Sequence, residues 1–413
     1  MTIHIDADRL RSDFDELAAI GGTAEGGVER LALTPAHLEA RRWFLRRAAA
    51  AGLGTSIDAA GNHSAILRSA SPDARTFLLG SHLDSVPNGG RFDGALGVVA
   101  ALEVLRTVKE HRLDLPVTLE AIDFTDEEGT LVGLLGSLAV AGVLDAEALA
   151  APRGGRDALL AGLASAGLKE ARLGEARRDP RTLAGYLELH IEQGPVLERA
   201  RVPIGVVRAI VGSRSLELVF EGASAHAGTT PMAARRDAGL GAARFVDRVH
   251  DAVTSGFPGA VATVGQVELE PGAFNVVPGS ARVLLEFRAG SAAELDRLEQ
   301  RLLHEARAVA TAQRLDLRVQ AVGRWEPSPL DASARAAITA AAASLGLSSI
   351  ELPSGAGHDA QALAQVTRAG MVFVPSVGGV SHQPGELTHW QDCVNGANAL
   401  LHSTVRLALE APT

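Results

Sequence analysis

Residues 80–94, GSHLDSVPNGGRFDG, place one histidine and two aspartates among several glycines, directly after the apolar run of residues 76–79. Imidazole nitrogens and carboxylate oxygens together suit zinc, manganese, cobalt or nickel, and glycines let the backbone pass close to such an ion. The single cysteine, Cys393, leaves no pair for a thiolate zinc site or an internal disulfide. Any metal must therefore be held by histidines such as His82 and by carboxylates such as Asp84 and Asp93.

Polar side chains follow other apolar runs in the same way. In chain order they are Glu127 and Glu128 after AIDFTD, His190 after GYLEL, and His382 after FVPSVGGVS. Ligands of open α/β sheets lie beyond the carboxyl ends of the strands, so we expect these side chains to converge. Each alone has an ordinary interpretation as a surface histidine, a solvated acidic turn or, for Asp93, a helix N-cap. Their joint placement favours metal chemistry.

Other polar residues give no comparable indication of catalytic or metal-binding roles. Five further histidines lie in polar or helical surroundings, and we interpret them as surface positions: His4, His37, His111, His250 and His304. Lysine occurs only at positions 109 and 169, and no Gly-x-Ser-x-Gly motif is present. These observations argue against Schiff-base and serine-hydrolase chemistry.

The elements that must position the polar residues alternate between strand and helix patterns. Residues 76–80 and 116–124 are typical of strands, and residues 94–111 between them have helical periodicity. Two more apolar strands are predicted at 185–194 and 370–379, each followed by a histidine or containing one. The pattern predicts an α/β fold with a mostly parallel central sheet.

A second pattern interrupts the first. Its predicted elements are a strand at 215–222, a helix at 232–253, strands at 260–270 and 281–290, a helix at 292–312 and a strand at 315–323. This βαββαβ order is the ferredoxin-like arrangement, a small sheet with both helices on one face. We therefore predict an inserted domain of residues 213–324 within a catalytic domain of residues 1–212 and 325–413.

Composition limits the possible partners. The chain has 413 residues, of which 46% are hydrophobic, enough to bury the cores of two domains. A net charge of -10 argues against nucleic acid as a partner, because phosphate binding needs a basic face. No uninterrupted apolar run of about 18 residues predicts a membrane span, and the N-terminus shows no signal pattern. We expect a cytoplasmic protein with no membrane partner.

Seven motifs, in chain order, carry a resemblance to a known family: GSHLDSVPNGGRFDGALGV, TDEEG, ELHIEQGPVLE, HAGTTPM, NVVPG, SGAGHDA and SHQPGE. The chain resembles the amidase/hydantoinase/carbamoylase branch of the aminoacylase and carboxypeptidase-like dinuclear metallohydrolases, from about residue 20 to about residue 410. The resemblance implies that the α/β part of the chain is a metallopeptidase-like catalytic domain and that the inserted domain is a ferredoxin-like lid and dimerisation domain. HIEQGPVLE and HAGTTPM are the most specific of these motifs.

The resemblance implies a centre of two divalent ions, manganese, zinc, cobalt or nickel. Asp93 would bridge them, His82 and His190 would bind one, and Glu128 and His382 would bind the other. A bridging carboxylate agrees with the chemistry of two-metal hydrolases, in which a water shared by the ions becomes hydroxide near neutral pH.

Two more residues of these motifs would act beside the ligands. Asp84 would accept the imidazole N–H of His82 and fix its tautomer. Glu127 would be the general base and then the general acid, because it neighbours a ligand but is free to take a proton from water.

The resemblance also implies how substrate is bound. Arg288 of the inserted domain would grip the substrate carboxylate with two parallel hydrogen bonds. Asn275 and Gln193 would offer neutral donors and acceptors, and Gly357 and His358 of SGAGHDA would also contact substrate.

A further histidine, His226 of HAGTTPM, would reach the active site of a partner subunit and stabilise negative charge on the attacked carbonyl oxygen. The inserted domain would then serve as dimer interface and as a lid, with hinges near residues 211–212 and 324–325. The resemblance thus implies a homodimer formed through this domain.

The expected activity is hydrolysis of a non-peptide C–N bond in an N-carbamoyl-L-amino acid or a related ureido acid. Allantoate and 3-ureidopropionate are alternative substrates. An alternative activity is that of an aminoacylase or dipeptidase, and a remote alternative is an inactive dimeric binding protein. The chain departs from the family at Leu131 and Val132, where Arg and Phe are common. This departure bears on the pocket beside the metal site, and so on the substrate.

Overall fold

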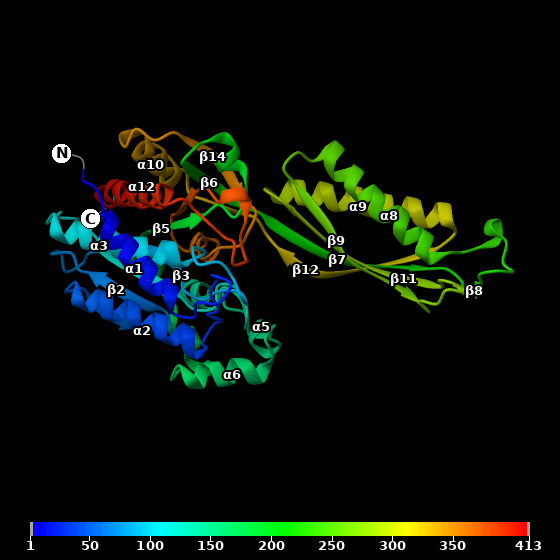
Figure 1. Cartoon of the computed structure of the whole chain (residues 1–413), viewed down its shortest axis with the longest axis horizontal. Helices are drawn as coiled ribbons and strands as arrows, with labels where there is room; N and C mark the ends of the chain where they lie inside the picture. Colours follow the sequence, from blue (N-terminus) through cyan, green and yellow to red (C-terminus); the bar gives the residue numbers. More distant parts are fainter. Residues whose placement is uncertain (1–2, 411–413) are drawn as a thin grey trace. The chain divides into compact units, whose positions relative to one another are not determined.

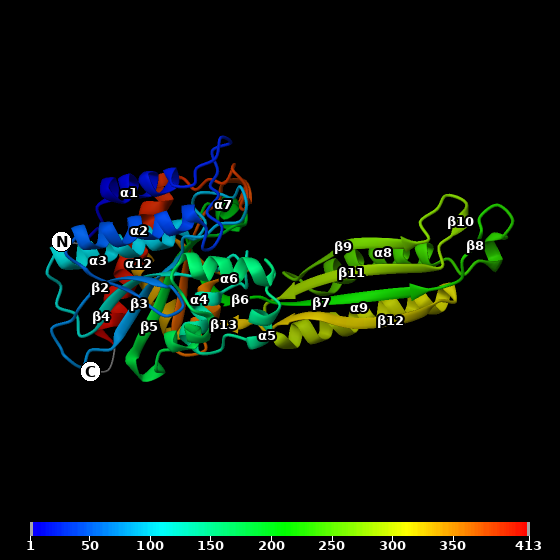
Figure 2. The same ribbon diagram turned by 90° about the horizontal axis from the view of Figure 1, so that it is seen from below.

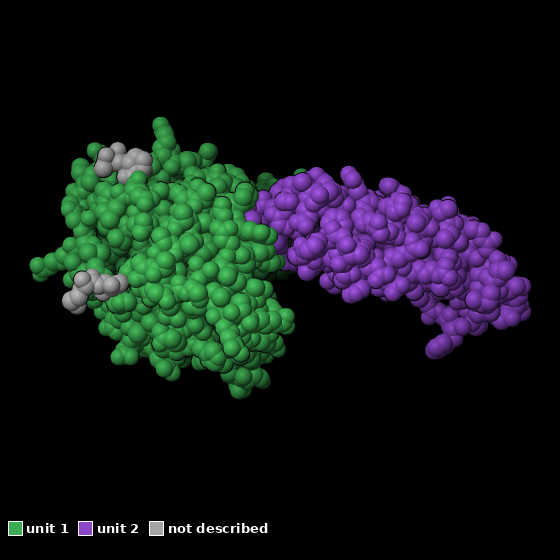
Figure 3. Space-filling view, turned by 90° about the horizontal axis from the view of Figure 1, so that it is seen from above, with its two compact units in different colours: residues 1–208, 329–413 green, residues 209–328 purple. Residues whose placement is uncertain are grey.

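The structure, a computed structural model, describes residues 3–410. The chain divides into two compact units (Figure 3). Unit 1 consists of residues 1–208 and 329–413, and unit 2 consists of residues 209–328. The segment predicted as an inserted domain, 213–324, lies within unit 2.

Unit 1 is built on a nine-stranded sheet with the order β1-β2-β4-β3-β5-β15-β6-β13, and β14 pairs with β6 (Figures 1 and 2). The strands are β1 Gly54–Ile57, β2 His63–Leu67, β3 Thr76–His82, β4 Thr118–Phe124, β5 Leu183–Ile191, β6 Ile204–Ile210, β13 Ser328–Pro329, β14 Ser349–Ser354 and β15 Ala369–Val374. The four inner strands β4, β3, β5 and β15 pair in parallel, whereas β2 and β6 join them antiparallel. The predicted mostly parallel sheet is confirmed.

Helices of unit 1 surround this sheet. They are α1 Ala7–Ala19, α2 Pro35–Ala50, α3 Ala95–Glu110, α4 Leu135–Ala141, α5 Ala146–Ala150, α6 Arg156–Ser165, α7 Val196–Ala200, α10 Ala332–Ser344, α11 Asp359–Leu363 and α12 Trp390–Leu409. Short 3-10 turns lie at Glu170–Ala176, Pro180–Thr182 and Val377–Gly379. Within the described residues, no helix is both long enough and apolar enough to cross a membrane.

Helix α3 is the central helix of unit 1. It packs against β3, β4 and β5 and also against α1 and α12, so its residues 95–108 are all buried. Gly97 makes this close packing possible, because a Cβ there would overlap the carbonyl oxygen of Leu189 and crowd Ser81. The resulting apolar core holds the start of α3 against the ends of two strands.

Unit 2 contains a four-stranded antiparallel sheet with the order β12-β7-β11-β9. Its long elements are β7 Gly212–Glu221, α8 Ala238–Gly256, β9 Val261–Glu270, β11 Ser280–Ala289, α9 Ala292–Gln313 and β12 Asp316–Trp325. Side chains of β7 and β11 alternate between buried and half-buried, and the buried set packs with α8 and α9. This is the βαββαβ order of the prediction.

Two details of unit 2 differ from the prediction. The helix predicted from residue 232 begins at Ala238, because the Asp237 side chain caps it by accepting the N–H of Leu240. Residues Met232–Ala234 form a separate 3-10 turn instead. A short pair of strands, β8 Ala225–His226 and β10 Val276–Val277, lies at one end of the unit (Figure 1).

Candidate metal centre

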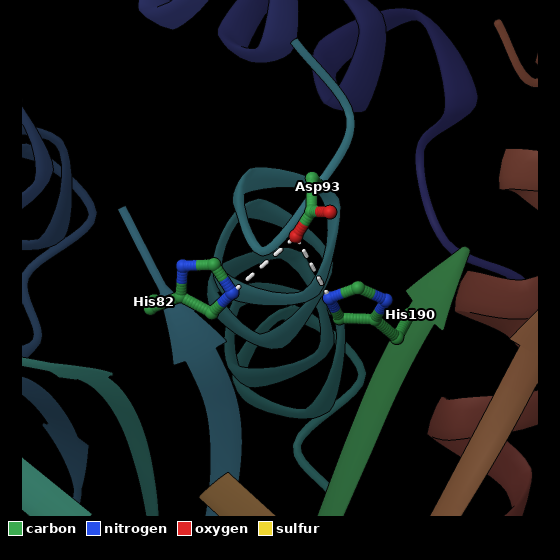
Figure 4. Close-up of side chains that lie close together, drawn as sticks. All are labelled: His82, Asp93 and His190. Carbon is green, nitrogen blue, oxygen red and sulfur yellow. Dashed lines mark ion pairs between the residues drawn. The ribbon is translucent and has the colours of Figure 1, made fainter. Parts of the chain in front are cut away.

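Asp93 lies just before α3, between the ends of β3 and β5, and faces a histidine from each (Figure 4). Its Oδ1 is 3.5 Å from Nε2 of His82 and 3.2 Å from Nε2 of His190. All three side chains are buried. This group of nitrogens and oxygen could hold one metal ion.

The second oxygen of Asp93 faces another group. Asp93 Oδ2 is 3.5 Å from Nε2 of His382, and that nitrogen is 3.5 Å from Oε2 of Glu128. Within each of the two groups, the ligand atoms lie within 4.8 Å of one another. The two groups are those that the resemblance implied, and Asp93 belongs to both.

The topology of the sheet explains the convergence. His82 ends β3 and pairs with Phe124 at the end of the parallel strand β4, three residues before Glu127. His190 lies near the end of the next parallel strand, β5. Parallel strands end at a common edge, so residues far apart in sequence meet there.

Backbone carbonyls fix the tautomers of the two buried histidines. Nδ1 of His82 lies 3.0 Å from the carbonyl oxygen of Asp84, and Nδ1 of His190 lies 2.9 Å from that of Ile191. A carbonyl can only accept a hydrogen bond, so Nδ1 carries the hydrogen in each ring. Nε2 then carries a lone pair in each ring, as a metal ligand requires. In His190 it accepts the backbone N–H of Gly94 at 3.2 Å, and in His82 it faces Asp93.

Asp84 acts differently from the sequence expectation. Its carboxylate is 3.7 Å from Nδ1 of His82, beyond hydrogen-bond distance, whereas its own backbone carbonyl accepts that N–H. The carboxylate oxygens accept the backbone N–H groups of Glu127 and Glu128, at 3.3 and 3.2 Å. Buried N–H groups need acceptors, and Asp84 supplies them for the loop that carries both glutamates.

The charges of the site call for a cation. The side chains of Asp93, Glu127 and Glu128 are at most 9% exposed. Burial raises the pKa of Glu127 well above its usual value and that of Glu128 to about 8, and repulsion from neighbouring carboxylates adds to both shifts. The buried Nε2 of His82 has no hydrogen-bond partner among the described residues. Crowded buried carboxylates and an unpaired imidazole nitrogen fit divalent metal ions.

Two of the predicted substrate residues lie at the centre. Gln193 donates from Nε2 to Asp93 Oδ2 at 2.7 Å, and its buried Oε1 has no hydrogen-bond partner in the described part of the chain. His358 is buried and packs edge-to-face with His190, with 4.5 Å between the ring centroids, and its Nε2 is 2.8 Å from Ser354 Oγ. The neighbouring Gly357 is exposed.

The remaining three predicted residues belong to unit 2. His226 is exposed, and its Nδ1 accepts the N–H groups of residues 228 and 229. It pairs with Val276 across the short strands, which places it beside Asn275. Arg288 lies near the end of β11 and donates to Glu286.

Leu131 and Val132, the departure from the family pattern, are buried. They belong to an apolar cluster that includes Leu159 and Leu163 of α6. Their backbone N–H groups bond to the Asp126 carboxylate. These side chains therefore anchor the loop after Glu128 to the interior of unit 1.

One histidine was misread from the sequence. His37 is fully buried at the start of α2, where its Nδ1 accepts the N–H of Leu33 at 2.8 Å. Burial, together with nearby Arg41 and Arg30, holds the pKa of His37 well below its usual value. The other four histidines interpreted as surface positions are exposed.

Sequence reasoning also missed two residues of the site. Ser381 and Glu386 both contact Asp93, the former through its hydroxyl and the latter through the Asp93 backbone N–H. Both lie within the SHQPGE motif, which was the available signal.

Comparison with known proteins gives matches along nearly the whole chain. A model of peptidase family M20/M25/M40 matches residues 78–405. The chain is 38% identical over 407 residues to the N-carbamoyl-L-amino acid amidohydrolase of Geobacillus stearothermophilus, covering 98% of this chain and 99% of that protein. It is 34% identical over 405 residues to the allantoate amidohydrolase of Escherichia coli (strain K12), covering 95% and 96%.

A solved structure is similar to this chain over its whole length. An amidase of the hydantoinase/carbamoylase family from Burkholderia multivorans matches with a TM-score of 0.90 and 36% identity, covering 100% of both chains. The resemblance that the motifs indicated is confirmed.

Gly94 provides a test of the first ligand group. It has a φ of 61°, and a Cβ there would overlap the ring of His82. We expect Gly94→Ala to displace that ring and weaken divalent metal binding by at least about tenfold. Elemental analysis and titration of the metal-free protein would measure this.

Gly174→Ala is the matched control, because Gly174 is exposed and a Cβ there would meet nothing within 4 Å. It should bind metal as the wild type does. A folded Gly94→Ala protein with unchanged metal affinity would contradict the role of His82.

Proposed function

This chain belongs to peptidase family M20/M25/M40, and from that premise we propose that it is a metal-dependent amidohydrolase acting on an N-carbamoyl-L-amino acid or a related ureido acid. The observation that carries the proposal is the shared carboxylate of Asp93, found in a chain with full-length similarity to an N-carbamoyl-L-amino acid amidohydrolase. Members of this family are metal-dependent hydrolases. Hydrolysis of such a substrate yields an amino acid, ammonia and carbon dioxide.

Two divalent ions, of manganese, zinc, cobalt or nickel, would be held at this site. His82 and His190 would bind one, Glu128 and His382 would bind the other, and Asp93 would contact both. The two ligand groups and the need to neutralise their buried carboxylates support this proposal. When bound, such ions supply Lewis acidity toward a substrate carbonyl and toward water.

Glu127 is the proposed general base. Its carboxylate belongs to neither ligand group, yet its Oε2 is 3.5 Å from Nε2 of His82. Asp84 accepts the backbone N–H of Glu127 and so holds this residue beside the proposed ligands. It would accept a proton from the attacking water and deliver a proton to the leaving nitrogen.

Substrate would be oriented by neutral and charged groups of both units. In unit 1, Gln193 stands nearest to Asp93, and Gly357 and His358 would line the site behind it. In unit 2, Arg288 would grip the substrate carboxylate through its planar fork, with Asn275 as a neutral partner. The hydrogen bond from Arg288 to Glu286 would have to open for this contact.

The geometry of unit 2 supports a dimer. His226 and Asn275 lie beyond the β11 end that begins at Ser280, whereas Arg288 lies near the opposite end of this strand. Arg288 is eight positions along β11 from Ser280, roughly 27 Å at the usual strand rise. If Arg288 and His226 both contact one substrate molecule, they must therefore come from different copies of the chain.

We accordingly propose a homodimer in which His226 of one copy stabilises negative charge on the substrate carbonyl oxygen at the partner's site. Unit 2 would form the dimer interface and serve as a lid. A cytoplasmic location stays a prediction.

Allantoate is the second candidate substrate, favoured by the similarity to an allantoate amidohydrolase. It is also a ureido acid, so the same residues would serve. Hydrolysis of 3-ureidopropionate, aminoacylase or dipeptidase activity, and an inactive binding role have weaker support. The inactive binding role is disfavoured because every proposed metal ligand and the proposed base Glu127 are present.

A substrate panel tests the proposed function. We expect the purified protein with Mn²⁺ to release ammonia from N-carbamoyl-L-amino acids in preference to allantoate, 3-ureidopropionate, N-acetyl amino acids or dipeptides. Chelation should abolish activity, and Mn, Co, Ni or Zn should restore it to different extents. Cleavage of dipeptides without ammonia release from any ureido compound would reject the proposal, as would full activity in metal-free protein.

Glu127→Gln tests the general base. The substitution removes a proton acceptor and no proposed ligand, so we expect kcat to fall about 10²- to 10⁴-fold while both ions stay bound. Steady-state kinetics and elemental analysis measure the two effects. Glu147→Gln, at an exposed position of α5, should leave both unchanged, and near-normal turnover of Glu127→Gln would refute the assignment.

Mixed dimers test His226. Glu127→Ala and His226→Ala should each be inactive, but refolding them together should restore roughly a quarter of wild-type activity, since half of randomly paired dimers are mixed and each has one intact site. Refolding Glu127→Ala with Asp93→Ala should restore no activity. Both residues would act at the site of their own copy, so each site of a mixed dimer lacks one of them. Verified mixed dimers as inactive as their parents would show that His226 does not act across the interface.

A further inference from the structure

Glu386 joins two loops that carry proposed metal ligands. It is 3% exposed and lies four residues after His382. Its Oε1 accepts the backbone N–H groups of Phe92 and Asp93, at 2.9 and 3.0 Å. Its Oε2 accepts the hydroxyl of Ser381 at 2.9 Å. One buried carboxylate therefore bonds to the Asp93 loop and to the His382 loop at once.

Ser381 closes the connection between these loops. Its hydroxyl lies 3.1 Å from Asp93 Oδ2, the oxygen that faces His382. The hydroxyl has one hydrogen and stands between two carboxylates, so it can donate to only one of them at a time. Glu386 thus reaches Asp93 in two ways, through the backbone N–H and through Ser381.

The surroundings leave Glu386 little freedom. A Cβ at Gly90 would overlap its carboxyl group, so the loop before Asp93 passes directly over the carboxylate. His382 has a φ of 58°, a left-handed conformation that is costly for a residue other than glycine. Such a conformation persists where neighbouring contacts determine it, and the bond from Ser381 to Glu386 is the contact next to it.

We propose that Glu386 is a positioning residue that holds Asp93 and His382 at metal-binding separation, and so sets the affinity for the ion bound by Asp93, Glu128 and His382. Glu386 belongs to neither ligand group, and both its oxygens already accept hydrogen bonds. It acts through its neighbours. The inference rests on the metal site of the proposed function.

Removing the carboxylate tests the inference. We expect Glu386→Ala to weaken one step of Mn²⁺ binding to the metal-free full-length protein by about 10- to 100-fold, the range typical for groups that orient ligands. Calorimetric titration measures both binding steps. The affected step should be the one that disappears in His382→Ala, because that variant lacks a ligand of this ion.

Glu386→Gln is the conservative variant. Its Oε1 could still accept both backbone N–H groups, and its Nε2 could donate to Ser381 Oγ, which leaves the hydroxyl hydrogen for Asp93. We therefore expect Mn²⁺ affinity within about threefold of the wild type. Ser381→Ala removes only the hydroxyl link and should weaken the same binding step by about threefold to tenfold.

Asp331→Ala is the matched structural control. Asp331 also accepts two backbone N–H groups, those of Ser333 and Ala334, together with a serine hydroxyl, at the start of α10. Its loss should lower the midpoint of thermal unfolding without changing either binding step. A merely structural role for Glu386 would produce this same result.

The results of these titrations distinguish the proposed metal site from the proposed role of Glu386. A wild-type protein that binds no divalent ion would overturn the metal site itself. If the wild type binds two ions and folded Glu386→Ala binds them equally well, only the role of Glu386 is overturned. If Glu386→Ala does not fold, Ser381→Ala decides, and unchanged Mn²⁺ affinity in that variant overturns the inference. A Glu386→Gln protein that is folded but binds Mn²⁺ as weakly as Glu386→Ala would also overturn it.

Discussion

Buried carboxylates at one edge of a parallel sheet are the constraint on which unit 1 depends. Asp93, Glu127 and Glu128 are withdrawn from water within a few ångströms of one another, and such charges are costly unless opposite charge and hydrogen bonds compensate them. The histidines at the ends of β3 and β5 present Nε2 lone pairs to this region and add no charge as neutral rings. Divalent cations would supply the missing compensation, so the site has the chemistry of a candidate metal centre.

A second set of acids holds the first in place. Asp84 accepts N–H groups from the glutamate loop, Asp126 accepts three from the residues that follow, and Glu386 accepts two from the Asp93 loop. In each case an ionisable side chain serves as an acceptor for loop backbone that no strand can satisfy. The loops at the sheet edge are therefore irregular in shape but fixed by hydrogen bonds.

The sequence predicted the parallel sheet and the convergence of polar residues at its edge because both follow from local signals, namely apolar runs and the polar residues just beyond them. The division of these residues into two ligand groups was implied by the family resemblance. The sequence could not predict which oxygen of Asp84 meets His82, since the backbone carbonyl and the side-chain carboxylate belong to the same residue. His37 was misread because it shares the buried face of its helix with the charged Arg41, so apolar periodicity did not mark position 37 as buried. Glu386 was passed over because an acid in a loop usually faces solvent.

The bond between Glu386 and Asp93 joins residues 293 positions apart. Unit 2 is synthesised between these two residues, so unit 1 is still incomplete when the ribosome has made all of the inserted unit. A nascent chain that ends before residue 381 already contains His82, Asp93 and His190, but it lacks the loop that closes the second group. The order of translation thus separates the two halves of the centre in time, and the segment that begins at residue 329 decides when unit 1 becomes whole.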